Sequence, residues 1–363
     1  MKVGIVGLPN VGKSTLFNCL SQSKAQSENY PFCTIDPNIS IVNVPDSRLN
    51  KLNSIISPQK LIPTTVKIVD IAGLVKGASK GEGLGNKFLS NIRETDAIIH
   101  VLRCFDDPNI VHVDGKISPI SDKEVVEYEL VLKDVEVVEK RLDKIKKTLR
   151  TGSNESKKEI EILENVLIQL EEMNVDRASY TDDQFEDFIK PLELISFKPI
   201  LYVCNVGERD VLSGNSYVEE VKKDLEGKAS EIIIISAKIE SEINELESFD
   251  EKKIFLDDLG LEESGSNKLI RASYRLLNLH SYFTAGEKEV RGWTIKIGDS
   301  AYDAAGQIHS DFQKGFICAE VISYKDYIEF GSELKVKEAG KMRLEGKEYI
   351  VSDGDIMHFR FNI

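Results

Sequence analysis

Residues 7–15 have the side chains and the spacing of a phosphate-binding loop, because they follow the pattern G-x-x-x-x-G-K-S. The apolar residues 2–6 before them predict a buried strand, and residues 15–20 predict a helix. Curled backbone N–H groups and a helix N-terminus bind phosphate, while a loop lysine reaches the β- and γ-phosphates and a loop hydroxyl ligates Mg²⁺. We therefore expect a nucleotide site in which Lys13 is catalytic and Ser14 holds the metal. The nucleotide-binding residues predicted here are Asn10, Val11, Gly12, Lys13, Ser14 and Thr15.

Two further polar groups are predicted to complete the phosphate and metal site. Asp70 ends an apolar stretch and begins the sequence Asp-Ile-Ala-Gly, so it stands where a carboxylate holds Mg²⁺ through water. Gly73 stands where a backbone N–H meets the γ-phosphate. Between the two motifs, Thr34 is the candidate for a second Mg²⁺ hydroxyl, with ordinary loop polarity as the alternative. The glycine-rich stretch after Asp70 predicts a switch segment that senses the γ-phosphate.

The residue that usually orients the attacking water is replaced. Ras-like GTPases place a glutamine directly after D-x-x-G, and this chain has Leu74, which can neither donate nor accept a hydrogen bond. Either hydrolysis is very slow or another group aligns the water. Asn10 offers one route by holding K⁺ beside the phosphates. His112, on a loop after an apolar strand, offers another, with a packing role as its alternative.

The base-recognition element departs from the guanine pattern N-K-x-D. The chain has Asn205-Val206-Gly207-Glu208 after an apolar strand, so the lysine is lost and the aspartate is one methylene longer. Losing a bidentate match to guanine forfeits about 1–3 kcal/mol of discrimination. Asn205 can still address the edge of adenine. The residues expected to bind the base are Asn205, Glu208, Ser236, Ala237 and Lys238. We therefore expect a GTPase-like fold that prefers ATP.

Apolar stretches rich in valine and isoleucine alternate with helical or glycine-rich stretches, which is typical of a mostly parallel α/β sheet. Residues 122–175 differ, because apolar residues recur every three or four positions along two helices separated by a glycine-containing break. They predict an antiparallel coiled-coil hairpin, which is either an arm for a partner or a stabilising insert. After residue 281, short strands alternate with turns, and one helix is expected over 301–312. The predicted segments are 1–121 and 196–280 for the nucleotide-binding domain, 122–195 for the helical insertion, and 281–363 for a small α+β domain.

The composition restricts the location and the partners. No apolar run approaches the roughly 18 residues that span a bilayer, and the five cysteines are scattered without a C-x-x-C, so we expect a cytoplasmic protein with reduced thiols and no membrane contact. The net charge of −14 is uneven. Residues 1–120 carry about +3, residues 121–280 about −14, and residues 281–363 about −3. A nucleic acid would therefore meet the first or the last segment.

Together these motifs resemble the YchF family, the Obg-like ATPase branch of the translation-factor GTPases. The residues that carry the resemblance are 7–15, 29–38, 70–86, 91–96, 205–208, 282–286, 311–317 and 353–359. The resemblance implies a Ras-like domain with an inserted coiled coil and a C-terminal TGS domain of ubiquitin-like β-grasp fold. It also implies ATP as the preferred substrate, slow hydrolysis, association with the ribosome or its large subunit, and RNA contact through the TGS or the N-terminal domain.

Three functions stay open at this point. The chain is a slow ATPase switch bound to the ribosome, a nucleotide-gated binding module with negligible turnover, or a genuine GTPase. Leu74 does not decide between the first two.

Overall fold

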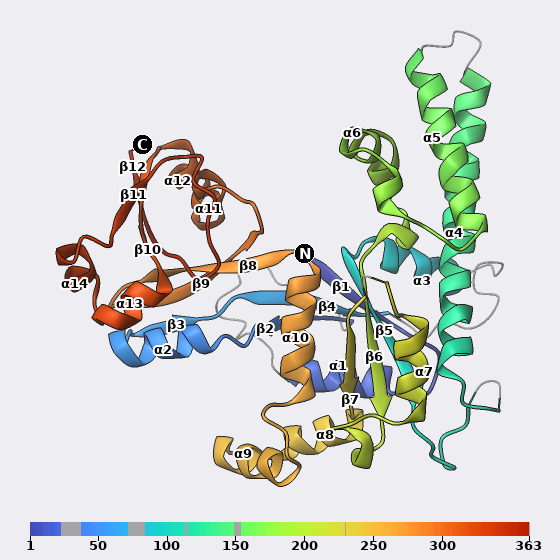
Figure 1. The fold of residues 1–363 in the computed structure, drawn as a ribbon, viewed down its shortest axis with the longest axis horizontal. Helices are drawn as coiled ribbons and strands as arrows, with labels where there is room; N and C mark the ends of the chain where they lie inside the picture. The colour runs from blue at the N-terminus through green and yellow to red at the C-terminus, as the bar shows by residue number, and fades with distance from the viewer. Residues whose placement is uncertain (23–37, 72–83, 113–114, 149–153, 229, 363) are drawn as a thin grey trace. The chain divides into compact units, whose positions relative to one another are not determined.

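The structure is a computed structural model that describes residues 1–22, 38–71, 84–112, 115–148, 154–228 and 230–362 (Figure 1). The described residues form two compact units, the first from 1–22, 38–40 and 68–266 and the second from 41–67 and 267–362. This division differs from the segments expected from the sequence, because residues 41–67 group with the C-terminal part. The predicted segment boundaries therefore stay predictions.

The first sheet has six strands in the order β2-β4-β1-β5-β6-β7. Its strands are β1 (Lys2–Val6), β2 (Ile39–Asn43), β4 (Thr65–Asp70), β5 (Ala97–Cys104), β6 (Ile200–Val206) and β7 (Ile232–Ile235). β1, β5, β6 and β7 pair in parallel, and all eight residues of β5 are buried. Both neighbours of β1 come later in the chain, so the order reverses at β1, which is where ligands bind in open parallel sheets.

Helices surround this sheet and carry the residues that follow its strands. They are α1 (Lys13–Gln22), α3 (Leu84–Arg93), α7 (Ser216–Asp224), α8 (Ala237–Glu245), α9 (Phe249–Asp258) and the start of α10 (Gly265–Leu276). α1 packs against α8, so the helix after the first strand and the helix after the last strand lie side by side. The buried carboxylate of Glu240 in α8 accepts hydrogen bonds from the backbone N–H groups of Gly265 (2.7 Å) and Ser266 (3.0 Å) at the start of α10.

The helical hairpin consists of α4 (Pro119–Thr148) and α5 (Asn154–Glu171), which run antiparallel beside each other (Figure 1). We call this hairpin the arm. Its core is aliphatic, with fully buried Val138, Leu163 and Leu170, and ion pairs such as Arg141–Glu159 (2.6 Å) join the two helices. The short helices α6 (Asp182–Gln184), η3 (Arg177–Ser179), η4 (Phe185–Ile189), η5 (Lys190–Leu192) and η6 (Ile195–Phe197) then lead back to β6.

The base of the arm is attached to the sheet domain by one fully buried and one partly buried charged side chain. The carboxylate of Asp134 in α4 is fully buried and accepts hydrogen bonds from the backbone N–H groups of Ile195 (3.0 Å) and Ser196 (2.7 Å). Lys198 donates to the carbonyl oxygens of Ile92 (3.0 Å), Arg93 and Thr95, which lie where α3 ends. Burial lowers the pKa of Lys198 to about 8.

The second unit has a mixed six-stranded sheet in the order β11-β10-β12-β8-β9-β3. The strands are β3 (Lys60–Ile62), β8 (Leu279–Ala285), β9 (Glu289–Lys296), β10 (Phe316–Ile322), β11 (Arg343–Glu345) and β12 (Ile356–Phe361). One face packs on α11 (Ala301–Ile308) and α12 (Ser310–Lys314), and the other on α2 (Ser47–Ile56), α13 (Tyr324–Phe330) and α14 (Glu333–Glu338). The expected single helix over 301–312 is thus two helices that meet at His309.

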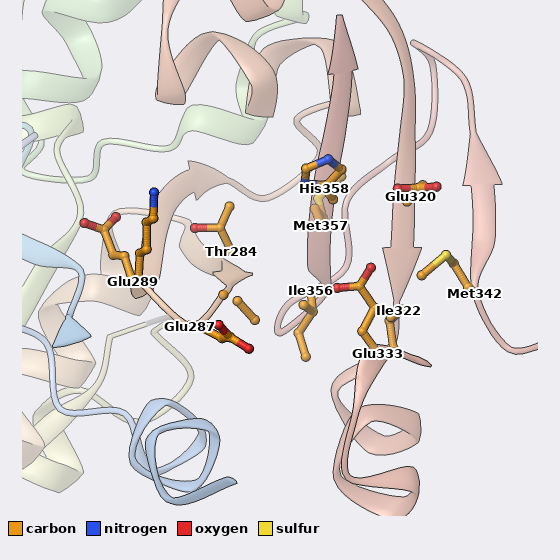
Figure 2. A pocket seen from close by; sticks show the side chains of 13 residues that line it. Thr284, Glu287, Glu289, Glu320, Ile322, Glu333, Met342, Ile356, Met357 and His358 are labelled. Carbon is orange, nitrogen blue, oxygen red and sulfur yellow. The ribbon is translucent and has the colours of Figure 1, made fainter. Parts of the chain in front are cut away.

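A cavity of about 450 Å³ lies in this second unit, beside the turn that joins β8 to β9 (Figure 2). β8 pairs with β12 in parallel at one position only, where Ile356 lies opposite Phe283, so the two strands are not paired along the cavity. Carboxylates dominate its charged lining, which consists of Glu287, Glu289, Glu320, Glu333 and Lys288. Such a lining repels phosphate groups.

Candidate nucleotide-binding site

The predicted phosphate-binding loop joins β1 to α1, as its sequence requires. Asn10 has φ of 64° and Gly12 has φ of 94°, so the chain curls through two left-handed residues before the helix begins. The turn is also tightly packed, because a Cβ atom at Gly12 would lie 2.2 Å from Nδ2 of Asn205. Backbone N–H groups at the start of α1 therefore line a concave turn, which is the geometry that binds an anion.

The two charged residues predicted for the phosphate and metal site meet in the structure. Lys13 is buried, and its ammonium group forms an ion pair with the carboxylate of Asp70 at the end of β4. Ser14 and Thr15 are exposed on the first turn of α1. Lys13 and Asp70 are 57 residues apart in the sequence, and they are in direct contact because β4 lies next to β1 in the sheet.

Asn205 connects three separate parts of the site. Its side chain is buried, its Nδ2 donates to the carbonyl oxygen of Val11 (2.8 Å), and its Oδ1 accepts from the backbone N–H of Ala237 (2.9 Å). The end of β6, the phosphate loop and the start of α8 are therefore joined by one amide. These bonds leave a single N–H of Nδ2 for the adenine contact expected from the sequence.

A cavity of about 650 Å³ extends from the phosphate loop between the ends of β5, β6 and β7. Eight of the predicted nucleotide-binding residues line it, namely Asn10, Gly12, Thr15, Asn205, Glu208, Ser236, Ala237 and Lys238. Glu208 and Lys238 form an ion pair across exposed side chains, and this bond raises the pKa of Lys238. Ser236 is buried, and its Oγ has no hydrogen-bond partner in the described part of the chain. The cavity therefore combines an apolar body with a few directed polar groups, as small-molecule sites do.

One wall of the cavity consists of residues that the sequence analysis did not select. Phe105, Asp106, Asp107 and Ile110 line it from the loop after β5. Their position in the chain could have indicated them, because the loops that follow parallel strands meet at the edge of the sheet where ligands bind. We call residues 105–111 the wall segment.

His112, the predicted water-orienting histidine, lies at the end of the wall segment. Its ring is buried, with Nε2 3.0 Å from Oδ2 of Asp122 in α4, and it is not among the residues that line the cavity. Asn10, the other predicted catalytic group, donates from Nδ2 to the carbonyl oxygen of Val111 (3.1 Å). This bond does not use its amide oxygen, which is the atom that would ligate K⁺.

Among the described residues, those beside the phosphate loop fit a hydrated Mg²⁺ ion. A carboxylate and a hydroxyl, from Asp70 and Ser14, flank the phosphate loop, and such hard oxygen groups are those that Mg²⁺ prefers. Thr34, Gly73 and Leu74 lie outside the described residues, as does most of the glycine-rich stretch that follows them.

Comparison with known proteins relates the whole chain to one family. Residues 2–166 match a family model described as "50S ribosome-binding GTPase", and residues 279–362 match the YchF GTPase C-terminal model, described as "Protein of unknown function (DUF933)". The "Ribosome-binding ATPase YchF" of Bacillus subtilis is 53% identical over all of this chain and all of its own length. The protein of that name from Escherichia coli O157:H7 is 50% identical, with 100% of this chain and 99% of its own covered.

Solved structures agree with these matches. The YchF GTPase of Schizosaccharomyces pombe has a TM-score of 0.88 and 39% identity, with 99% of this chain and 97% of that chain covered. A GTP-binding protein of Pyrococcus horikoshii, 21% identical with a TM-score of 0.61 over both whole chains, shares the fold.

Proposed function

The chain belongs to the YchF family, and from this membership we propose that it is a ribosome-associated ATPase that works as a slow molecular switch. One observation supports the proposal most directly. The phosphate loop, with Lys13 beside Asp70, opens into a cavity whose far end carries the base-recognition residues. Members with this family name are called ribosome-binding ATPases, and those names suggest the partner for this chain.

In the proposed reaction, the protein positions the triphosphate and offsets its charge. The N–H groups of the phosphate loop bind the β- and γ-phosphates, and Lys13 exchanges part of its contact with Asp70 for phosphate oxygens. Ser14 and Asp70 would hold Mg²⁺, directly and through water. A bound Mg²⁺ would neutralise charge between the phosphates. Without a glutamine after D-x-x-G, Asn10 with K⁺ would stabilise the attack of water, or His112 would do so after leaving its buried contact with Asp122, so intrinsic turnover is slow.

Preference for ATP is proposed on the shape of the base end of the cavity. Guanine is read by a short carboxylate that accepts from two of its N–H groups. Here the longer Glu208 is paired with Lys238, and an apolar Val206 replaces the usual lysine. Both changes remove the match to guanine.

Shortening the glutamate tests this assignment. We expect Glu208→Asp to raise the affinity for GTP relative to ATP by about tenfold, because an aspartate restores the two-bond acceptor for guanine. Calorimetric titration of each nucleotide with the variant and with the unchanged chain measures the ratio. The control is Glu219→Asp, which shortens an exposed glutamate of α7. An unchanged ratio for Glu208→Asp, or tighter GTP than ATP binding by the unchanged chain, would favour the GTPase alternative.

The charges limit how the ribosome would be met. The acidic cavity of the second unit is unsuited to RNA phosphate, so an RNA contact through that unit would have to use another face (Figure 2). The arm is stabilised by its own core and ion pairs, which suits a rigid contact element. We propose that the nucleotide-binding unit meets ribosomal RNA and that the arm, which lies in the acidic middle of the chain, contacts protein.

Single-turnover hydrolysis distinguishes the switch from a binding module with negligible turnover. We expect ATP cleavage by the purified chain to be slow and to accelerate when ribosomes and K⁺ are added together. Both would help to position the reacting groups and to stabilise the transition state, a task for which the chain lacks the usual glutamine. Rates are measured with radiolabelled ATP in K⁺ and in Na⁺ buffers, with and without ribosomes. Absence of any stimulation, with ATP binding intact, would favour the binding module.

A further inference from the structure

Arg103 of β5 is the largest fully buried side chain in the described structure, with 1% of its surface exposed. Its guanidinium donates to the carbonyl oxygens of Ile110 (3.0 Å), Phe105 (3.2 Å) and Asp107 (3.3 Å). All three acceptors belong to the wall segment. The guanidinium carbon also lies 4.7 Å from the centre of the Phe105 ring.

The three residues whose carbonyls are bound are also residues that line the nucleotide cavity. Turning a carbonyl oxygen toward Arg103 sets the plane of its peptide and restricts where the adjoining side chains can lie. A single guanidinium thus determines the backbone orientation of Phe105, Asp107 and Ile110 together. Arginine suits this task because its five N–H donors form a rigid planar fork, whereas the three donors of lysine all lie on one nitrogen atom.

The charge of Arg103 is balanced in an unusual way. In the ranges that the structure describes, no carboxylate forms an ion pair with it, and its partners are backbone carbonyls and one aromatic face. Burying a cation is costly without such bonds. The hydrogen bonds of Arg103 order a loop that burial does not hold in place. Four of its residues are exposed, namely Asp106, Pro108, Asn109 and Ile110.

Other bonds hold the wall segment from its outer side and its ends. Tyr217 of α7 donates to Oδ1 of Asp106 (3.1 Å), and Asn215 donates to the carbonyl oxygen of Cys104 (2.8 Å). At the far end, Asn10 of the phosphate loop binds the carbonyl oxygen of Val111. Arg103 is the member of this set that contacts the segment from beneath and at three points.

We propose that Arg103 is a positioning residue that fixes the wall of the cavity against the base and the ribose of a bound nucleotide. The inference rests on the proposed nucleotide site and adds a residue that contacts no phosphate. It places Arg103 behind the nucleoside half of the site, while Lys13 serves the phosphate half.

The test compares Mg-ATP with Mg-tripolyphosphate, which has the phosphates and lacks the nucleoside. We expect Arg103→Met and Arg103→Lys to weaken ATP binding by about tenfold or more, while tripolyphosphate binding stays within about twofold. Isothermal titration of both ligands gives the affinities, and retained tripolyphosphate binding shows that the phosphate loop is folded. The matched control is Arg141→Met, which removes a partly exposed arginine of the arm.

A milder variant keeps the test decisive if the arginine variants do not fold. Tyr217→Phe removes the hydroxyl that binds Asp106 and should weaken ATP binding by about two- to threefold without changing tripolyphosphate binding. Unchanged ATP affinity in the folded arginine variants, or equal losses for both ligands, would overturn the inference, as would an unchanged Tyr217→Phe where the arginine variants are unfolded. If the unchanged chain bound ATP no better than tripolyphosphate, the nucleotide site itself would be wrong.

Discussion

Replacing Lys13 by alanine is expected to abolish nucleotide binding, with a loss of at least about a hundredfold in affinity. The ammonium group is the buried cation of the phosphate loop, and charge-assisted bonds to phosphate contribute several kcal/mol in a site of low polarity. Its removal also leaves the carboxylate of Asp70 unopposed beside the phosphates. Titration with a fluorescent ATP analogue measures the loss.

Matched substitutions make this result interpretable. Lys222→Ala removes a lysine from an exposed ion pair with Glu219 on α7 and should leave nucleotide affinity unchanged. Combining Lys13→Ala with Asp70→Asn removes both charges and separates the lost attraction from the added repulsion. Micromolar binding retained by Lys13→Ala would contradict the role assigned to the loop.

The second large effect concerns stability. Asp134→Ala should lower the free energy of unfolding by about 2–4 kcal/mol, because one buried and one partly buried backbone N–H group lose their acceptor. Burial raises the pKa of Asp134, which means that the desolvation cost already offsets part of the hydrogen-bond energy. Urea unfolding followed by circular dichroism gives the difference. Asp143→Ala, at an exposed position of the same helix, should change stability by less than about 0.5 kcal/mol. Equal values for the two variants would show that the attachment at Asp134 is unimportant.

The sequence predicted the strands of the first sheet other than β2, and it predicted the phosphate loop, because both have short-range signals. A continuous apolar run identified β5, and glycine spacing identified the turn before α1. The helical hairpin was also recognisable, since its apolar residues recur with helical period. The membership of the family is confirmed by the comparisons.

Long-range pairing was harder to predict. β3 has three residues, and its place in the second sheet depends on contacts with β9 more than 220 positions away. Residues 348–351 belong to the part where short strands were expected after residue 281, and they form only an isolated bridge between Ile350 and Ser300. Arg103 resembled any residue of a buried strand, because its importance comes from where three carbonyl oxygens of the following loop point. The direction of a loop carbonyl has no pattern in the sequence.

The attachment of the arm also has an engineering consequence. Asp134 lies 14 residues before α4 ends, so about 20 Å of hairpin extends beyond this attachment. The facing pair Arg141 and Glu159 marks a level at which the two helices could be rejoined by a short turn. A chain shortened there would keep Asp134, Lys198 and the cavity, and would lack only the outer half of the part of the hairpin that extends beyond Asp134. Partner recognition and nucleotide chemistry could then be studied as separable modules.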